Sequence, residues 1–172
     1  QTDTAVVTTI YPATALTAVV TEAFTNNATI TVTVNPMGTG SLIYSLDGGA
    51  WQSSNVFTGV EAGQHSLIVE DEEGCTNLSK TIDVIDYPKY FTPNGDGIHD
   101  TWKIVGLEAK HNAKIYIFDR YGKLIKQINP LGEGWNGMYN GQQAPSTDYW
   151  FNVEYTENEQ PKQFKAHFSL KR

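Results

Sequence analysis

The sequence contains little of what disulfide-bonded, membrane-spanning or secretory-precursor proteins require. Among 172 residues Cys75 is the only cysteine, so no disulfide forms within the chain, and it stays free or pairs with a cysteine elsewhere. No apolar run approaches the roughly 20 residues of a membrane helix. The first residues lack the basic-then-apolar pattern of a secretory signal peptide. We therefore expect a soluble monomer that is a fragment of a longer protein.

Basic residues are almost missing from the first half of the chain. Residues 1–85 carry nine acidic side chains and one base, Lys80, a formal charge of −8. Residues 86–172 carry ten acids and eleven bases, a formal charge of +1. Nucleic-acid binding draws its affinity from clustered lysines and arginines, so this composition argues against it. The change of charge near Asp86 indicates a domain boundary.

Charged residues make up only 18% of the chain, whereas aromatic residues reach 12%. Together with abundant Thr, Val, Ile and Gly, this composition is typical of short strands joined by turns. We predict an all-β protein with two immunoglobulin-like antiparallel β-sandwich domains in tandem. Residues 1–13 are predicted to be a linker or the end of a preceding module, 14–85 the first sandwich and 86–172 the second.

The first sandwich is predicted from alternation and turns. Residues 28–34, "ATITVTV", alternate threonines with apolar residues, which is typical of a strand with one buried face. Asp47-Gly48-Gly49 suits a tight hairpin turn, because glycine tolerates a positive φ. A short returning strand follows at Trp51. We expect about seven strands, with a core that includes Trp51, Phe57 and Leu67.

The second sandwich is predicted from two hairpins. Residues 100–107 and 113–128 supply strands, and the latter turn at residues 120–123. Residues 148–172 form another hairpin, with a polar loop from Thr156 to Lys162. In its last strand alternate residues face inward, which builds the C-terminus into a sheet. These inward residues are Phe164, Ala166, Phe168 and Leu170. Residues 132–150, rich in Gly, Asn and Pro, should wrap one end, held by Trp135 and Tyr139.

The stretch "YFTPNGDGIHD" at residues 90–100 has two interpretations. In the register of a calcium loop, its oxygen donors fall at alternate positions around Gly97. These donors are Thr92, Asn94, Asp96, the backbone carbonyl of Ile98, and Asp100. The twelfth position, which normally supplies a bidentate glutamate, is instead Lys103. The alternative interpretation is that Asn94 and Asp96 cap their own turn.

Catalytic groups are not arranged in a recognisable motif. A hydrolytic triad needs a nucleophile held by an oriented base, and none of the four histidines lies in such a motif. These histidines are His65, His99, His111 and His167. No Gly-rich loop opens a helix for phosphate. We therefore predict that the chain is not an enzyme.

A cluster of aromatic residues leaves a carbohydrate-binding or cell-adhesion module as the alternative function. Trp135, Tyr139, Tyr149 and Trp150 could form a platform on which sugar rings stack. However, alternation along "DYWFNVEY" at residues 148–155 places Tyr149 and Phe151 on one side of the strand. Trp150 falls on the other side. This pattern assigns most of the aromatic set to the core.

Four motifs of the second half resemble a known family. They are "PKYFTPNGDGIHDTWKI" at residues 88–104, "IYIFDRYGKLI" at 115–125, "GWNGMYNGQQAPSTDYWF" at 134–151 and "HFSLKR" at 167–172. In this order they resemble the gliding motility-associated C-terminal domain, the type B sorting domain of the Bacteroidetes type IX secretion system. Residues 44–76 resemble immunoglobulin-like repeats of large gliding adhesins. Ala166 departs from the family pattern, which commonly shows glycine there.

This resemblance implies delivery. Such domains address a cargo protein, already in the periplasm, to the outer-membrane translocon, which passes it to the cell surface or the medium. The implied partners are translocon components and associated outer-membrane β-barrel proteins. The resemblance explains the turn at residues 90–100 but implies no cofactor, so calcium rests on the oxygen spacing alone. Matched motifs place the recognition surface on the hairpin turn, the wrapped loop and the tail. Its residues are Asp119, Arg120, Tyr121, Gly122, Trp135, Gly137, Asp148, His167, Ser169, Lys171 and Arg172.

Overall fold

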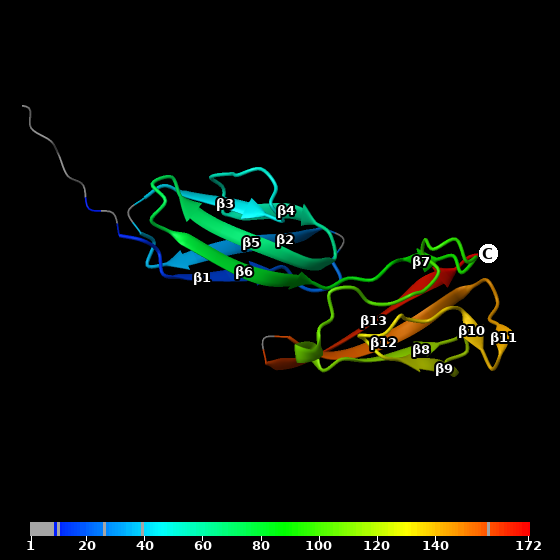
Figure 1. Cartoon of the computed structure of the whole chain (residues 1–172). Coiled ribbons are helices and arrows are strands. Elements are labelled where there is room, and N and C mark those ends of the chain that lie inside the picture. The colour runs from blue at the N-terminus through cyan, green and yellow to red at the C-terminus, as the bar shows by residue number, and fades with distance from the viewer. Residues whose placement is uncertain (1–8, 10, 26, 39, 158) are drawn as a thin grey trace, which may run out of the picture. The chain divides into compact units, whose positions relative to one another are not determined.

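The computed structural model describes residues 9, 11–25, 27–38, 40–157 and 159–172. The chain divides into two compact units, Gln1–Val84 and Ile85–Arg172 (Figure 1). The all-β antiparallel fold class is confirmed, and the only helical element in the described residues is one 3-10 turn, η1 (Ala109–His111). Most of the expected linker 1–13 lies outside the described residues. Ala13, however, is buried and donates its backbone N–H to Thr76 Oγ1.

The first unit is built from two three-stranded sheets. One sheet has the order β1-β2-β4, from strands β1 (Ala15–Val20), β2 (Ala28–Asn35) and β4 (Val56–Val60). The other has the order β3-β5-β6, from strands β3 (Leu42–Leu46), β5 (Gly63–Asp71) and β6 (Asn77–Val84). All neighbouring strands are antiparallel. Alternation in β2 buries Ile30, Val32 and Val34, as the sequence predicts.

The core of this unit includes two of the three predicted residues. Leu67 is fully buried, and Phe57 packs against the core while partly buried. The prediction for Trp51 is wrong, because this side chain is 45% exposed. The expected strand at Trp51 is a single bridge between Tyr44 and Gln52. The described residues of this unit therefore form six strands in place of about seven.

The Asp47-Gly48 turn is fastened by a histidine. Asp47 and Gly48 have φ values of 54° and 68°, and Gly49 N–H donates to Leu46 O at 2.9 Å. His65 Nδ1 lies 2.7 Å from Asp47 Oδ2, and His65 Nε2 lies 2.9 Å from the carbonyl of Glu61. Both partners are acceptors, so only the doubly protonated imidazolium satisfies both contacts. Burial opposes this charge, but the bonds to Asp47 and Glu61 outweigh it and raise the pKa of His65 above 6.5.

The raised pKa predicts a pH-dependent stability of the first unit. The unfolded imidazole titrates near its ordinary value, so the stabilisation is full below about pH 6.5 and is lost as the pH rises through the folded pKa. We expect an NMR titration of His65 to give a pKa above 6.5. Asp47→Asn should lower that pKa, because the carboxylate partner is gone. An unchanged titration in this variant would contradict the assignment.

The second unit contains one five-stranded sheet of order β7-β13-β12-β8-β9 (Figure 1). Its strands are β7 (Tyr90–Phe91), β13 (Gln160–Leu170), β12 (Asp148–Glu157), β8 (Lys114–Phe118) and β9 (Leu124–Ile128). A small hairpin, β10 (Met138–Tyr139) with β11 (Gln142–Gln143), lies in the segment predicted to wrap one end. Where the structure describes the pairing in this sheet, β7 runs parallel to β13 and the other pairs are antiparallel.

Two expected features of the second unit are shorter than predicted. Residues 100–107 form no strand, and instead make single bridges at Trp102 and Val105. The prediction of a polar loop from Thr156 to Lys162 is also wrong, because β12 and β13 remain paired as far as Glu157 and Gln160. The Lys162 ammonium lies 2.6 Å from Glu157 Oε2 across this pair. Cross-strand contacts of this kind let polar residues continue a strand.

An aromatic core lies on the inner face of the sheet. Trp102 and Trp135 exchange two backbone hydrogen bonds of 2.9 and 2.8 Å, and both side chains are fully buried. The Trp102 ring stacks on Phe168, with centroids 3.9 Å apart. The indole N–H of Trp102 donates to Pro88 O, and that of Trp135 donates to Met138 O, each at 2.9 Å. Residues 88–104 and 134–138 are thereby fixed to the sheet through their tryptophans.

Candidate functional site

The three segments that the sequence assigns to a recognition surface meet at one end of the sheet, which we call the turn end. It comprises residues 119–123, 144–148 and 169–172. Arg120 Nη2 donates to Thr147 Oγ1, and Ser169 Oγ donates to Asp148 Oδ1 at 2.6 Å. Leu170 N–H donates to Thr147 O at 3.0 Å. The turn end is therefore one hydrogen-bonded structure rather than three separate loops.

The hairpin turn of the turn end is held by one carboxylate. Asp119 Oδ1 accepts the backbone N–H groups of Tyr121 and Lys123, both at 2.9 Å. Gly122 has a φ of 79°, a value that glycine adopts without strain. Tyr121 is 87% exposed at the tip. The turn thus presents a large side chain on a rigid backbone.

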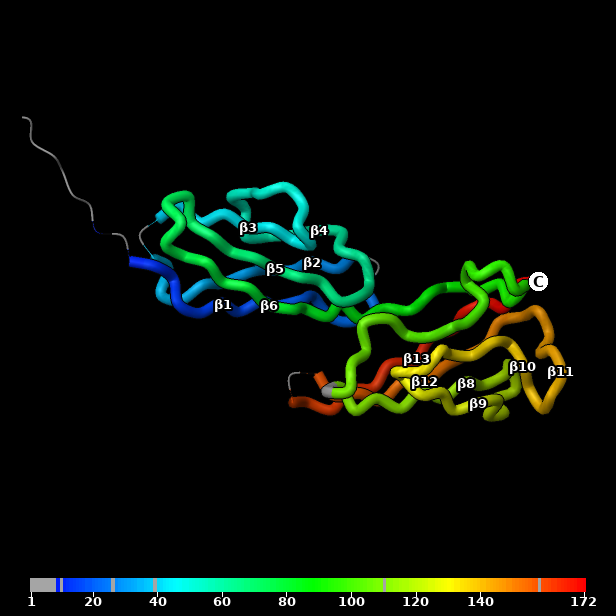
Figure 2. The backbone as a smooth tube through the Cα atoms, in the orientation of Figure 1, coloured from blue at the N-terminus to red at the C-terminus, as the bar shows by residue number. Residues whose placement is uncertain are grey.

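The C-terminal residues are anchored on both sides. Figure 2 shows the chain end lying beside the green segment that Figure 1 labels β7. Lys171 N–H donates to Phe91 O at 3.0 Å, and the Lys171 ammonium lies 4.4 Å from the centre of the Tyr90 ring. Arg172 Nη1 donates to Ala144 O at 2.5 Å, and Nη2 donates to Gly137 O at 3.1 Å. The recognition surface predicted from the sequence includes three cationic residues, Arg120, Lys171 and Arg172. All three side chains are exposed, yet each contacts its own domain.

Two residues predicted for the surface are buried. Trp135 is fully buried in the aromatic core. Gly137 is also buried, with a φ of 75°. Of the remaining predicted residues, Asp148 and His167 are exposed and Ser169 is half-buried. Trp135 and Gly137 therefore support the surface from beneath.

Gly137 provides a stability test of the turn end. A Cβ at this position would lie 2.9 Å from Arg172 Nη2, 3.0 Å from Leu170 Cδ1 and 3.2 Å from Pro93 Cγ. We expect Gly137→Ala to lower the free energy of unfolding by about 2–4 kcal/mol through backbone strain and crowding. Gly141→Ala is the matched control, because its φ is 77° but nothing lies within 4 Å of the added Cβ. Equal losses in urea denaturation would contradict the crowding.

The residues 90–100 form a turn whose side chains bond its own backbone. Asp100 Oδ1 and Oδ2 accept the N–H groups of Gly95 and Gly97 at 2.6 and 2.7 Å. Asp96 Oδ1 accepts Ile98 N–H at 2.7 Å, and Asp96 Oδ2 accepts Asn94 Nδ2 at 2.8 Å. The bond from the Asn94 side chain, with that from Ile98, lowers the pKa of Asp96.

Hydrogen bonds within the turn favour the capped turn over the calcium loop, which stays a prediction. The carboxylate oxygens of Asp96 and Asp100 already accept N–H donors, as does Asn94 Oδ1. Among the described residues, no group of three or more His, Cys, Asp or Glu side chains could hold a metal ion. The capped turn therefore accounts for these residues, and Thr92 and Ile98 belong to its backbone framework. Thr92 N–H donates to His99 O at 2.8 Å.

The capped turn predicts what a calcium loop would not. We expect Asp100→Ala to lower the free energy of unfolding by about 1–3 kcal/mol, because two backbone N–H groups lose their acceptor. We expect the same melting temperature in calcium and in chelator, for the unmodified chain and the variant alike. Ile98→Ala, at a 65% exposed side chain in the same turn, is the control. A calcium-dependent melt that Asp100→Ala abolishes would instead support the metal site.

The four aromatic residues considered as a sugar platform do not share a surface. Trp135 and Tyr149 are buried, and the Tyr149 hydroxyl donates to Pro145 O at 2.9 Å. Burial raises the pKa of Tyr149, which keeps the phenol protonated as a donor. Trp150 is 43% exposed on the opposite face of β12. The platform built on Trp135 is therefore wrong.

Trp150 belongs to a row of side chains that the sequence-based surface omitted. Strand pairing places His167 opposite Trp150, Trp150 opposite Phe118, and Phe118 opposite Leu124. We call these four residues the outer row, since they cross the face of the sheet opposite the aromatic core. The signal in the sequence was a tryptophan at an outward position of an alternating strand. Its neighbours in the outer row could be identified only from the register of four paired strands.

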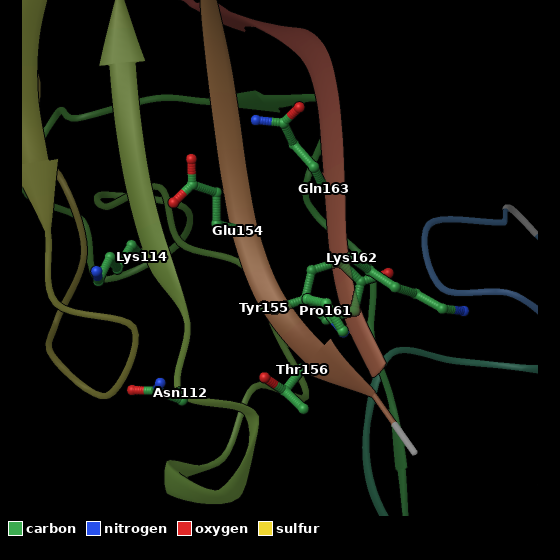
Figure 3. A pocket seen from close by; sticks show the side chains of 8 residues that line it. All are labelled: Asn112, Lys114, Glu154, Tyr155, Thr156, Pro161, Lys162 and Gln163. Atoms are coloured by element: carbon green, nitrogen blue, oxygen red, sulfur yellow. The ribbon is translucent and has the colours of Figure 1, made fainter. Parts of the chain in front are cut away.

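A hollow of about 420 Å³ lies on the face of the sheet that carries the outer row, nearer η1 (Figure 3). Lys114, Glu154 and Gln163 line it from the adjacent strands β8, β12 and β13.

Of the histidines, His111 Nδ1 accepts Glu108 N–H at 2.7 Å, and His167 lies beside Trp150, with ring centroids 6.2 Å apart. The partner of His99 is the Tyr90 ring.

Comparison with known proteins gives one family and several solved structures. A model of the CHU_C type IX secretion signal domain matches residues 85–170. No curated protein matches the chain. No helix in the described part of the chain is long and apolar enough to cross a membrane.

Three similar solved structures are distant in sequence. The BSP domain of a biofilm associated protein is 8% identical, with a TM-score of 0.28, over 89% of this chain and 29% of that one. A two-domain fibronectin type III segment of chicken tenascin is 12% identical, with a TM-score of 0.28, over 89% of this chain and 97% of that one. Immunoglobulin domains 1–4 of Sidekick-1 are 10% identical, with a TM-score of 0.25, over 91% and 50%. This chain thus spans less than a third of the first of these structures, and similarities this weak carry no argument about function.

Proposed function

We propose a delivery function from one premise, that the chain belongs to the family of CHU_C type IX secretion signal domains. The family establishes sorting to the type IX secretion system and export across the outer membrane to the cell surface or the medium. We propose further that the folded unit 85–172 is itself the address. Its partners would be the translocon and associated outer-membrane β-barrel proteins.

One observation carries this proposal. The matched residues 85–170 coincide with the compact unit Ile85–Arg172, and the last strand of that unit is part of its core. Phe168 and Leu170 are buried, so the terminal residues are not available as an extended peptide. A receptor that recognises a preformed surface loses little conformational entropy on binding. The exposed part of the turn end supplies such a surface.

The first unit is proposed to be a spacer or an adhesive repeat of the cargo. It has its own buried core, formed between two sheets. Its acidic character keeps it soluble and makes nonspecific adhesion to anionic surfaces unfavourable. This assignment makes residues 14–84 dispensable for export.

Three reporter fusions test the delivery function. Each carries a signal for export to the periplasm, followed by the reporter and by residues 1–172, 85–172 or 1–84. In a host with the type IX system, we expect the first two fusions outside the cell and the third in the periplasm. A host without the translocon should retain all three. If the fusion to residues 1–172 stays in the periplasm of the competent host, the proposal fails.

A further inference from the structure

The outer row exposes large apolar side chains that adjoin one another on a sheet face. Trp150 is 43% exposed and Leu124 49% exposed, with the half-buried Phe118 between them. Each alone would be an ordinary feature of a protein surface. Adjacent exposed apolar groups cost hydration free energy together, and contiguous patches mark binding sites.

The outer row borders an open hollow of about 470 Å³. Its apolar lining residues are Phe118, Trp150 and Phe151, and the cross-strand pair of Asn152 with Lys165 adds polar groups. Asn152 Oδ1 is buried without a hydrogen-bond partner. The hollow thus combines an apolar wall with a few polar groups, which is typical of a site for one anchoring side chain.

The charges around the hollow define its occupant. Arg120 and Lys165 line it, and Asp119 is the one carboxylate among its described lining residues. Asp119 Oδ1 is already bonded to the N–H groups of Tyr121 and Lys123. The balance around the apolar wall is therefore positive. A complementary partner presents carboxylates beside an apolar side chain.

We propose that this hollow and the outer row are where the export machinery binds the domain, through an acidic protein segment whose apolar side chain packs against Trp150. The proposal rests on the delivery function and identifies the surface and the chemistry of its partner. Trp150 anchors the contact, because buried tryptophans dominate binding energy at interfaces. Lys165 acts at the rim, where charge steers association.

The decisive test compares two exposed tryptophans in the reporter fusion to residues 1–172. Trp150 is 43% exposed and Trp51 of the first unit 45% exposed, so Trp51→Ala is the matched control. We expect Trp150→Ala to lower the ratio of extracellular to periplasmic reporter about tenfold or more, as loss of an interface anchor does. Trp51→Ala should export like the unmodified fusion. Thermal melts of the purified chains verify folding.

A second pair of variants keeps the test valid if Trp150→Ala is unstable. Leu124→Asp adds a negative charge to the outer row, and Leu131→Asp adds it to a 59% exposed leucine of another loop. We expect export to fall with Leu124→Asp and with Lys165→Glu, because both repel an acidic partner. Leu131→Asp should export normally. Normal export of the folded Trp150→Ala and Leu124→Asp fusions would overturn the proposal.

Three outcomes separate this proposal from its alternatives. If the unmodified fusion is retained in the periplasm, the delivery function itself fails. If sedimentation shows self-association that Trp150→Ala abolishes, the occupant is a second copy and the proposal is overturned. Saturable binding to a panel of soluble polysaccharides that depends on Trp150 would also overturn it, in favour of a sugar site.

Discussion

Deleting residues 167–172 is expected to unfold the second unit and to leave a fused reporter in the periplasm. The deletion removes Phe168 and Leu170, which are 0% and 2% exposed. It also removes the pairing of Leu170 with Phe91 and of Phe168 with Tyr149. Losing two large core side chains costs about 5–9 kcal/mol, comparable to the whole stability of a small domain.

A point variant distinguishes loss of the fold from loss of a terminal peptide. Phe168→Asp keeps the last four residues, Ser-Leu-Lys-Arg, but places a carboxylate in the aromatic core. We expect it to lose circular dichroism signal from the second unit and to be retained like the deletion. Export of an unfolded Phe168→Asp fusion would show that the address is linear.

Trp102→Ala is expected to be among the most destabilising single changes in the second unit. This side chain is fully buried, stacks on Phe168 and donates its indole N–H to Pro88 O. Truncating a buried tryptophan costs about 3–5 kcal/mol, through lost burial and the cavity left behind. Urea denaturation followed by circular dichroism measures the loss.

The matched control for this change is Trp150→Ala in the same unit. Because Trp150 is 43% exposed, its truncation should cost far less folding free energy than that of Trp102. The two variants should therefore differ in their main effect. Trp102→Ala should lower the free energy of unfolding, whereas Trp150→Ala should lower export of the reporter with little loss of stability. Equal losses of stability would contradict the assignment of the two sheet faces.

The family resemblance and the face of each long strand were predictable from the sequence. Period-two alternation places Phe151 and Phe168 inward and Trp150 outward, because successive side chains of a strand point to opposite faces. Turn chemistry was equally local. Asp47-Gly48 and the turn at Gly122 adopt positive φ values as their residue types predict. These features depend on neighbours in the chain, so the sequence alone determined them.

Only the tertiary structure decided what those faces meet. Trp51 follows a turn as a core residue would, yet it is exposed because its segment makes one bridge instead of a strand. Oxygen spacing in residues 90–100 suits calcium, but the folded turn gives those oxygens to backbone N–H groups. The outer row joins residues 118, 124, 150 and 167 through the register of four strands. Register is a long-range property, set by which strands pair and how their cores pack, and no local pattern specifies it.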